Sequence, residues 1–402
     1  MIDREALLGD AREDLLRSRY DQARQRYQEL LQADDRDVEA LTGMTRVALG
    51  KGELGQARSH ADRVLTEQPD HEEAKILRLV VIEAEGDPRS ALTEMQQLAE
   101  RHPSSCLAAY HTGRLLAAFG RGDEALPWLD RAFAQADRAR HRYAIANLIG
   151  YVQQDLGRFA EAVQTHQRAI EISAKRTEAY VALTDALVRG GDDEAGLTML
   201  REAETRIGDH SDFYRKRAEI LAAREDFAGA RKAAQRVCDR HPDDATAWLT
   251  VAQLCLSCGD FQAAEQAATK SRNAAPEAWQ PYFQLGLAYD AQNDGEQAET
   301  AYREALGREP DSWQPANNLG LALLARGTTP AATEAVELFT RAIELADAGN
   351  IGPRFNLALA LARLPDDQAR FQKLADELLG AELPKAQRDK LESLRAELDT
   401  DR

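Results

Sequence analysis

The stretch Trp279-Gln-Pro-Tyr-Phe-Gln-Leu-Gly-Leu-Ala288 recurs 34 residues later as Trp313-Gln-Pro-Ala-Asn-Asn-Leu-Gly-Leu-Ala322. Before and after this pair, an alanine or glycine recurs along the chain at intervals of 34 or 37 residues: Ala23, Ala57, Ala91, Ala125, Ala162, Gly196, Ala230, Ala264, Ala298 and Ala335. A fixed period of this length is typical of repeat architectures. We expect one structural unit per period, with loops taking up two three-residue insertions near residues 140–142 and 328–330.

Each period contains two blocks of apolar and small residues at helical spacing. Tyr282, Leu285 and Tyr289 form one such block, and Ala298 and Tyr302 belong to the next. Apolar residues three and four positions apart fall on one face of a helix. Each unit is therefore predicted to be a pair of amphipathic helices.

Punctuating residues separate these helices. Gly or Asp stands between the two helices of a unit, as in Gly157-Arg-Phe159 and Asp294-Gly295, where a left-handed C-cap is expected. Prolines at a common place in the period are predicted to end the second helices: Pro69, Pro103, Pro242, Pro276 and Pro310. Glycines on the first helices are predicted to let paired helices approach closely: Gly113, Gly150, Gly286 and Gly320.

A 34-residue helix-turn-helix with this pattern of small, aromatic, alanine and proline positions resembles the tetratricopeptide repeat (TPR) family. The resemblance implies an all-α fold, a right-handed superhelical solenoid. Ten full repeats and a degenerate eleventh fit, starting near residues 4, 38, 72, 106, 143, 177, 211, 245, 279, 313 and 351. We expect residues 1–380 to form the solenoid. Residues 381–402 are expected to form a capping helix and tail, with Leu391, Leu394 and Leu398 at helical spacing.

Composition excludes several classes of function. The 402 residues include 68 acids and 51 bases, a net charge of -17, which disfavours binding to nucleic acid or to anionic membrane surfaces. No apolar run approaches the roughly 18 residues that a membrane-spanning helix requires, so no membrane insertion is expected. Four cysteines form no disulfide framework, and the start Met-Ile-Asp-Arg-Glu lacks the layout of a secretory signal. We expect a cytoplasmic protein.

No catalytic or cofactor motif stands out. Cys238-x-x-His241 and Cys255-x-x-Cys258 have the spacing of zinc ligands. However, the second pair lies well inside a predicted helix, roughly 10–15 Å from the first pair at a rise of 1.5 Å per residue. We interpret the cysteines as core residues and expect no metal, no cofactor and no enzymatic activity. The basic run at residues 138–142 is interpreted as a solvated loop.

The resemblance implies that first helices line a concave groove that binds protein or peptide partners. From repeat eight onward the groove positions are mostly neutral and lined by amides. The main candidate contacts lie in repeats nine to eleven: Phe283, Gln284, Leu287, Asn317, Asn318, Leu321, Phe355 and Asn356. Amides offer both donors and acceptors to an extended peptide, and apolar residues accept its side chains. Alternatively, these residues pack neighbouring repeats together.

In repeats one to seven, acids outnumber arginines at the groove positions, which predicts a basic partner segment. Arg114, Asn147 and Tyr151 are the candidate contacts there. The paired lysines and asparagines with which some TPR proteins clamp an acidic C-terminal tail are missing from the groove positions. The sequence therefore disfavours an acidic C-terminal tail as the ligand.

The leading hypothesis is a non-enzymatic scaffold or adaptor for protein partners in a bacterial assembly, secretion or envelope-biogenesis pathway. A self-associating structural protein, and hence a homo-oligomer, is a second possibility. A regulatory subunit of a separately encoded enzyme is a third.

Overall fold

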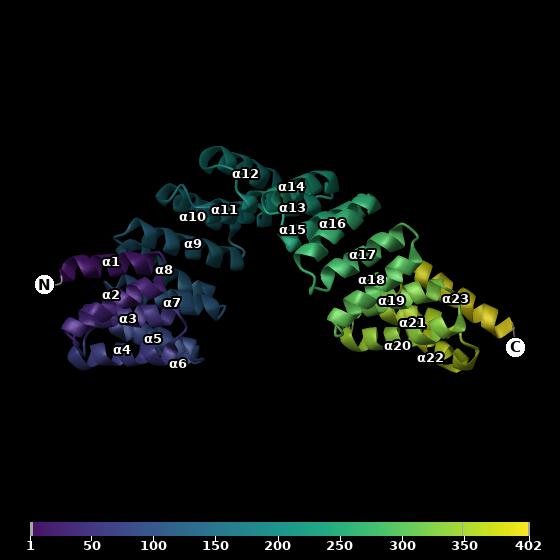
Figure 1. Ribbon diagram of the computed structural model, residues 1–402, viewed down its shortest axis with the longest axis horizontal. Coiled ribbons are helices and arrows are strands. Elements are labelled where there is room, and N and C mark those ends of the chain that lie inside the picture. Colours follow the sequence, from purple (N-terminus) through teal and green to yellow (C-terminus); the bar gives the residue numbers. More distant parts are fainter. Residues whose placement is uncertain (1–2, 348, 401–402) are drawn as a thin grey trace. The chain divides into compact units, whose positions relative to one another are not determined.

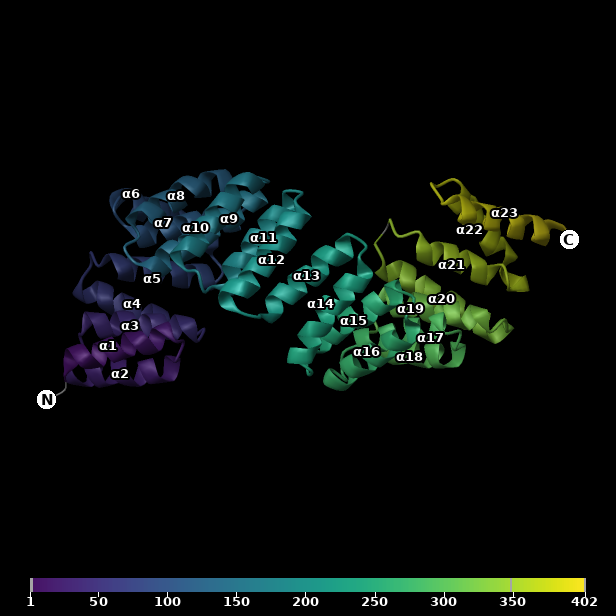
Figure 2. The ribbon, with the colours of Figure 1, turned by 90° about the horizontal axis from the view of Figure 1, so that it is seen from above.

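The computed structural model describes residues 3–347 and 349–400, whose regular structure consists of 23 α-helices and one 3₁₀ turn, η1 (Figure 1). Consecutive helices pair as antiparallel hairpins, and within each of two compact units every hairpin packs on the next one (Figure 2). The predicted fold class is confirmed: an all-α array of about eleven hairpins with a capping helix. The helices fall into two compact units, one ending at Gly208 and the other beginning at Asp209.

Unit 1 contains the first six hairpins: α1 (Arg4–Leu16), α2 (Tyr20–Ala33), α3 (Val38–Gly50), α4 (Leu54–Glu67), α5 (Glu72–Ala84), α6 (Pro88–Arg101), α7 (Cys106–Ala118), α8 (Gly122–Gln135), α9 (Ala139–Asp155), α10 (Phe159–Ile172), α11 (Thr177–Arg189) and α12 (Asp193–Ile207).

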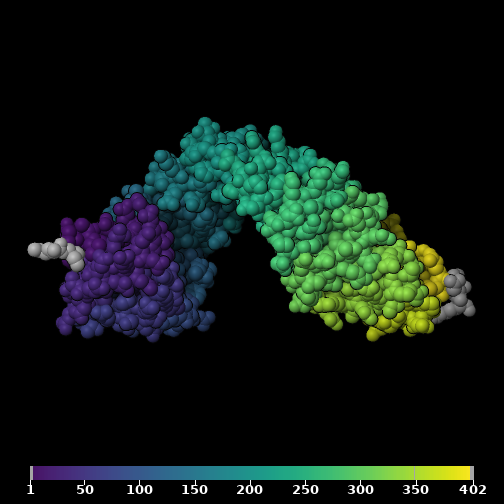
Figure 3. Space-filling model, viewed as in Figure 1, coloured from purple at the N-terminus to yellow at the C-terminus, as the bar shows by residue number. Residues whose placement is uncertain are grey.

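Unit 2 contains the rest: α13 (Ser211–Ala223), α14 (Phe227–Arg240), α15 (Ala245–Ser257), α16 (Phe261–Ala274), α17 (Gln280–Ala291), α18 (Gly295–Arg308), α19 (Trp313–Ala325), α20 (Thr329–Leu345), α21 (Gly352–Leu361), η1 (Pro365–Asp367), α22 (Gln368–Leu379) and α23 (Lys385–Thr400). In Figure 3 side chains fill the space that the ribbons leave open between neighbouring helices of each unit.

Short polar residues fix the helix starts. The Asp37 carboxylate accepts the amide N–H groups of Glu39 (3.0 Å) and Ala40 (3.1 Å) at the start of α3. Asp294 accepts the Gln297 N–H (3.2 Å) at the start of α18 in the same way. Such N-caps supply partners to amide groups that have none within the helix.

The turns within hairpins use a left-handed residue, as predicted. Gly157 has φ +73°, a conformation that glycine adopts without strain. In the turn before α18, however, the left-handed residue is Asn293 (φ +62°), whereas the sequence points to Asp294-Gly295. Asparagine tolerates this conformation better than other side chains do, which leaves Asp294 free to cap the helix.

Close approach of paired helices depends on glycine. A Cβ built on Gly286 of α17 would lie 2.3 Å from Cε1 of Tyr302 on α18, and one on Gly320 would lie 2.7 Å from the Phe339 ring. Tyr302 and Phe339 are themselves fully buried. The prediction that these glycines admit a neighbouring side chain is confirmed.

Helices, not loops, take up the two insertions, so that part of the prediction is wrong. Helix α9 has 17 residues, whereas the other first helices of unit 1 have 13, and α20 has 17 residues where α14, α16 and α18 have 14. The inserted residues extend each helix at its first turn, where Pro330 is also tolerated because no intrahelical N–H bond is lost. The basic run at 138–142 is consequently the start of a helix, and it remains solvent-facing.

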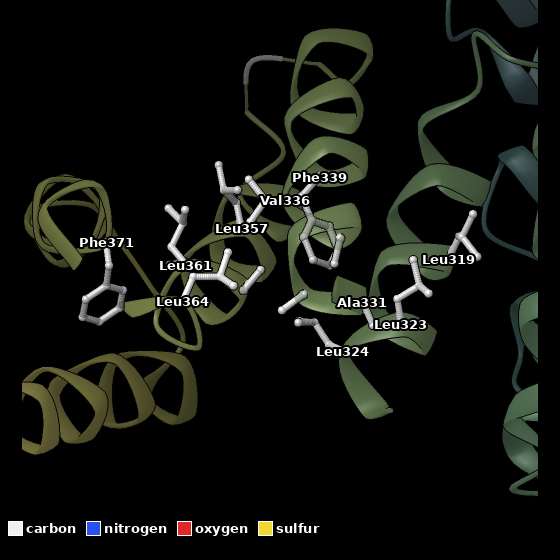
Figure 4. Packing of buried hydrophobic residues seen from close by; sticks show 14 of the residues in the cluster. Leu319, Leu323, Leu324, Ala331, Val336, Phe339, Leu357, Leu361, Leu364 and Phe371 are labelled. Atoms are coloured by element: carbon white, nitrogen blue, oxygen red, sulfur yellow. The ribbon is translucent and has the colours of Figure 1, made fainter. Parts of the chain in front are cut away.

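The last hairpins share one apolar core (Figure 4). Phe339 of α20, Leu361 of α21 and Phe371 of α22 belong to this core, and Leu391 of α23 closes it with no exposed surface. Leu394 and Leu398 pack partly against it. Helix α23 is therefore the capping helix that the sequence predicts.

Candidate functional site

The eight candidate residues of repeats nine to eleven all lie on first helices of unit 2. Phe283, Gln284 and Leu287 are on α17; Asn317, Asn318 and Leu321 are on α19; Phe355 and Asn356 are on α21. We call the surface formed by these eight residues the amide surface.

The asparagines of the amide surface bond to one another. Asn356 Nδ2 donates to Asn317 Oδ1 (2.8 Å), which joins α21 to α19. Asn317 Nδ2 in turn donates to Asn318 Oδ1 (3.1 Å). The amides thus link successive repeats directly, which is the packing role that the sequence left open.

The chain of hydrogen bonds continues into the hairpin of repeat nine. Asn318 bonds to the Tyr302 hydroxyl, and this hydroxyl donates to Asp290 Oδ2 at 2.6 Å. Burial and the neighbouring Asp290 both raise the pKa of Tyr302, so the phenol keeps its proton and acts as a donor. Burial also raises the pKa of Asp290, and the hydrogen bond from Tyr302 opposes that effect. The network therefore runs from α21 through α19 and α18 to α17.

Two of the amides do not face solvent. Gln284 is 6% exposed and Asn317 is 8% exposed, so the expectation that these side chains line an open groove is wrong for both. The Gln284 Oε1 acceptor is buried and has no hydrogen-bond partner within residues 3–347 and 349–400. Gln284 consequently belongs to the interior of the repeat. Asn318 and Asn356 are half-buried and retain a solvent-facing edge.

The apolar residues also contribute accessible area to the amide surface. Leu321 is 38% exposed. Phe283, Leu287 and Phe355 are half-buried and pack partly on the core of the last hairpins. The Phe283 ring is fixed edge-on against Trp279, with ring centroids 5.8 Å apart. An incoming side chain would therefore meet ordered apolar edges interrupted by Asn318 and Asn356.

The three candidates of unit 1 form two separate local groups. Arg114 of α7 is bound by both oxygens of Glu83 on α5, one of them at 2.8 Å from Nη1. Asn147 and Tyr151 of α9 bond to each other, and the 41% exposed Tyr151 ring stands edge-on to His166 with centroids 5.4 Å apart. Only Tyr151 among the three presents a large free surface.

Further ion pairs connect the first helices of unit 1. Arg12 of α1 bonds Glu39 of α3 at 2.8 Å, and Arg46 of α3 pairs with Glu73 of α5 at 2.5 Å. These acids are neutralised by neighbours, which a count of acidic positions in the sequence does not reveal. Tyr302, the link between Asn318 and Asp290, also escaped sequence reasoning because it lies on a second helix in a position typical of core residues.

The cysteines lie apart from this chemistry. Cys238 and Cys255 are each 1% exposed and pack in one apolar core of unit 2, and burial raises the pKa of Cys238 to about 12. The described part of the chain contains no group of three or more His, Cys, Asp or Glu side chains placed to hold a metal ion. Nor is any described helix both long and apolar enough to span a membrane.

Comparison with solved structures finds resemblances of low identity. Yeast Tom70 is 14% identical, with 98% of this chain and 96% of that chain covered and a TM-score of 0.46. MamA from Desulfovibrio magneticus RS-1 is 22% identical over 43% of this chain and 96% of its own, with a TM-score of 0.39. A thermophilic TPR protein from Thermus thermophilus is 18% identical over 46% of this chain and 98% of its own, with a TM-score of 0.37.

Comparison with curated proteins gives no match. Family models described as tetratricopeptide repeat match residues 15–79, 83–140, 143–176, 215–278 and 283–350. These segments cover most of the hairpins described above, at the positions where the period places repeats. The chain therefore belongs to the tetratricopeptide repeat family.

Proposed function

We propose that this protein is a non-enzymatic scaffold that binds a segment of a partner protein on the amide surface. TPR repeats bind protein partners, and this surface is the part of unit 2 where apolar and amide side chains gather on first helices. The observation that carries the proposal is Leu321, a large apolar side chain left 38% exposed one helical turn after the half-buried Asn318 of α19. An exposed apolar side chain beside polar groups of fixed direction suits an extended peptide.

Apolar residues and asparagines of the amide surface would make two different kinds of contact with a bound segment. Leu321 and the edges of Phe283, Leu287 and Phe355 would bury apolar side chains of the partner. Asn318 and Asn356 are already oriented by their hydrogen bonds to Asn317, so they would lose little side-chain entropy on pairing with a peptide backbone. Binding would thus use a preorganised surface.

Affinity capture from the native cell tests the proposal, with wild type compared against Leu321→Ser. Phe119→Ser is the matched control, since Phe119 is also 38% exposed but lies at the end of α7 in unit 1. The partner should be depleted from the Leu321→Ser sample and retained by the control. Titration of the purified partner into each variant then measures the loss of affinity. Equal capture by both variants would contradict the amide surface as the binding site.

The pathway and the place of action remain predictions from the sequence, namely bacterial assembly, secretion or envelope biogenesis, and the cytoplasm. The identity of the captured partner decides both.

A further inference from the structure

Unit 1 contains a half-open cavity of about 440 Å³, and none of the candidate contacts named above lines it. Its walls come from α1, α2, α3, the start of α5 and the start of α9. We call it the arginine-lined cavity, and its lining residues are Arg12, Leu15, Leu16, Tyr27, Glu39, Thr42, Gly43, Arg46, His71, Glu73, Arg138 and Arg140. A volume of this size is in the range that holds a small ligand or a few side chains.

Positive charge dominates this lining in a protein whose net charge is -17. Four guanidinium groups face two carboxylates. Arg12 and Arg46 hold those carboxylates, Glu39 and Glu73, against the wall. Glu39 also accepts a hydrogen bond from Arg4 at 2.7 Å. The two acids are thus engaged and do not neutralise the remaining arginines.

Arg138 and Arg140, at the start of α9, are the uncompensated charges. In the described ranges of the chain neither forms an ion pair, and Arg140 donates only to Nε2 of its neighbour His141, at 3.3 Å. Burial lowers the pKa of His141, Arg140 and Arg138 lower it further, the adjacent Asp137 opposes them, and Arg46 adds a smaller lowering. Arg46 of α3 lines the same cavity as Arg138 and Arg140 at the start of α9, so arginines from separate repeats surround a common space.

The cavity also has an apolar side. Leu16, at the end of α1, is 61% exposed, the largest fraction of any large apolar side chain described. The floor is Tyr27, which is buried and packs so tightly on Gly43 that a Cβ there would lie 2.2 Å from the ring. A rigid aromatic floor, an exposed leucine and free guanidinium groups therefore meet in one place.

We propose that the arginine-lined cavity binds an acidic segment of a partner protein, one that presents two carboxylates and an apolar side chain. The basic segment predicted from the count of acids in repeats one to seven does not suit this lining, because Glu39 and Glu73 are already paired with arginines. Four arginines against two engaged glutamates leave two positive charges, which two carboxylates would neutralise. Arginine offers each carboxylate a two-pronged set of N–H donors. Leu16 would cover the apolar side chain. The proposal rests on the proposed protein-binding function in one respect, that the ligand is a protein segment.

Fluorescence anisotropy with labelled synthetic peptides tests this site in the full-length protein. The probe is Ser-Gly-Glu-Leu-Glu-Gly-Ser, and its counterpart carries Gln in place of both Glu residues. The acidic peptide should bind at least about tenfold more tightly, because each charge-assisted hydrogen bond is worth roughly a factor of ten. Equal binding of the two peptides would overturn the proposal.

The double variant Arg138→Gln/Arg140→Gln locates the binding. It should weaken binding of the acidic peptide by roughly tenfold for each guanidinium that bonds a carboxylate. The control Arg89→Gln/Arg201→Gln makes the same change in net charge at two exposed residues of unit 1 outside the cavity, and should bind like wild type. Removing positive charge from the start of α9 should not unfold the helix, because the positive end of the helix dipole disfavours cations there. Circular dichroism of the double variant measures whether helix content is retained. Equal losses in both double variants would assign the effect to overall charge and overturn the site.

This outcome is separable from the fate of the amide surface. If the acidic peptide fails to bind while Leu321→Ser still releases a captured partner, only the arginine-lined cavity is refuted. If Leu321→Ser has no effect while the acidic peptide binds as described, the amide surface alone is refuted.

Discussion

Different chemistry joins first helices across repeats in the first three repeats of unit 1 and in the last repeats of unit 2. Unit 2 also has an ion pair of this kind at its other end, where Arg215 of α13 pairs with Asp244 at the start of α15. In unit 1, charged pairs such as Arg12 with Glu39 and Arg46 with Glu73 connect successive first helices. In unit 2, Asn356 and Asn317 connect them by a neutral hydrogen bond, next to half-buried apolar residues. The hairpins are of one kind in both units, so the repeat backbone does not require either chemistry. Surface positions of the first helices are therefore available for different partners.

The largest expected difference between the units concerns acid. Burial lowers the pKa of His111 and of His166 to about 4, and both residues lie in unit 1. The unfolded chain takes up protons as the pH falls through about 6.5, whereas the folded histidines resist until about pH 4. The contribution of each histidine to the free energy of unfolding is therefore fully present above pH 6.5. It falls as the pH drops, by about 3 kcal/mol per histidine at pH 4.

Hydrogen exchange of the full-length protein at pH 7 and pH 5, above most carboxylate titration, measures this loss separately in each unit. Helices of unit 1 should lose more protection than those of unit 2. His166→Gln should reduce the loss in unit 1. Equal loss of protection in the two units would contradict the assignment to these histidines.

A smaller effect is expected from filling the close contact in unit 2. Gly286→Ala places a methyl group 2.3 Å from the Tyr302 ring, which overpacks the hairpin and should cost about 1–3 kcal/mol. Displacing Tyr302 would also disturb its bonds to Asp290 and Asn318. Chemical denaturation measures the loss. The control is Gly307→Ala in α18, where a Cβ would meet nothing within 4 Å. This substitution should leave the free energy of unfolding unchanged or raise it.

The asparagine network offers a third test. Asn317→Ala removes the residue that both Asn356 and Asn318 contact, and should cost about 1–3 kcal/mol because partly buried groups lose their partners. The double variant Asn318→Ala/Asn356→Ala should have a lower melting temperature. It should also bind the partner more weakly, by about 0.5–1.5 kcal/mol for each neutral hydrogen bond lost. Unchanged affinity with a lowered melting temperature would leave the amides with a packing role alone.

The smallest effect is expected from the ion pairs of unit 1. Glu83→Gln keeps the shape of the side chain that holds Arg114 but removes its charge, and should cost no more than about 1 kcal/mol. The difference from wild type should shrink in 1 M salt, because salt screens exposed charges. A cost that persists at high salt would show that the pair acts through packing instead.

Much of the fold could be predicted from the sequence because burial imposes a local pattern. Ala264 and Ala298 are fully buried where helices cross, and Gly286 and Gly320 admit a ring, so small residues must recur at these positions in every period. The insertions were misplaced for a related reason. A three-residue change in period is visible in the sequence, but alanine, arginine and threonine fit a loop and a helix start almost equally well.

The candidate site was only partly predictable. Leu321 is exposed, in keeping with its groove position, yet Gln284 and Asn317 are buried although they occupy neighbouring positions in the same pattern. Residues half a helical turn apart can lie on the exposed and the buried side of the same helix. The packing of the next repeat against the helix decides which of these residues are covered. The pairing of Asn317 with Asn356 depends on the adjacent hairpin and leaves no mark on local periodicity.

The sequence by itself determined the repeat, the helical hairpins, their caps and their small-residue crossings, because each of these depends on residues within one period. Only the tertiary structure decided which surface side chains meet across periods. It placed Arg138 and Arg140 of α9 on the same cavity as Arg12 of α1 and Arg46 of α3. It also paired Glu39 with Arg12 and Glu73 with Arg46. The physical reason is that the path of a stacked array sums many small packing angles between hairpins, and no short stretch of sequence encodes that sum.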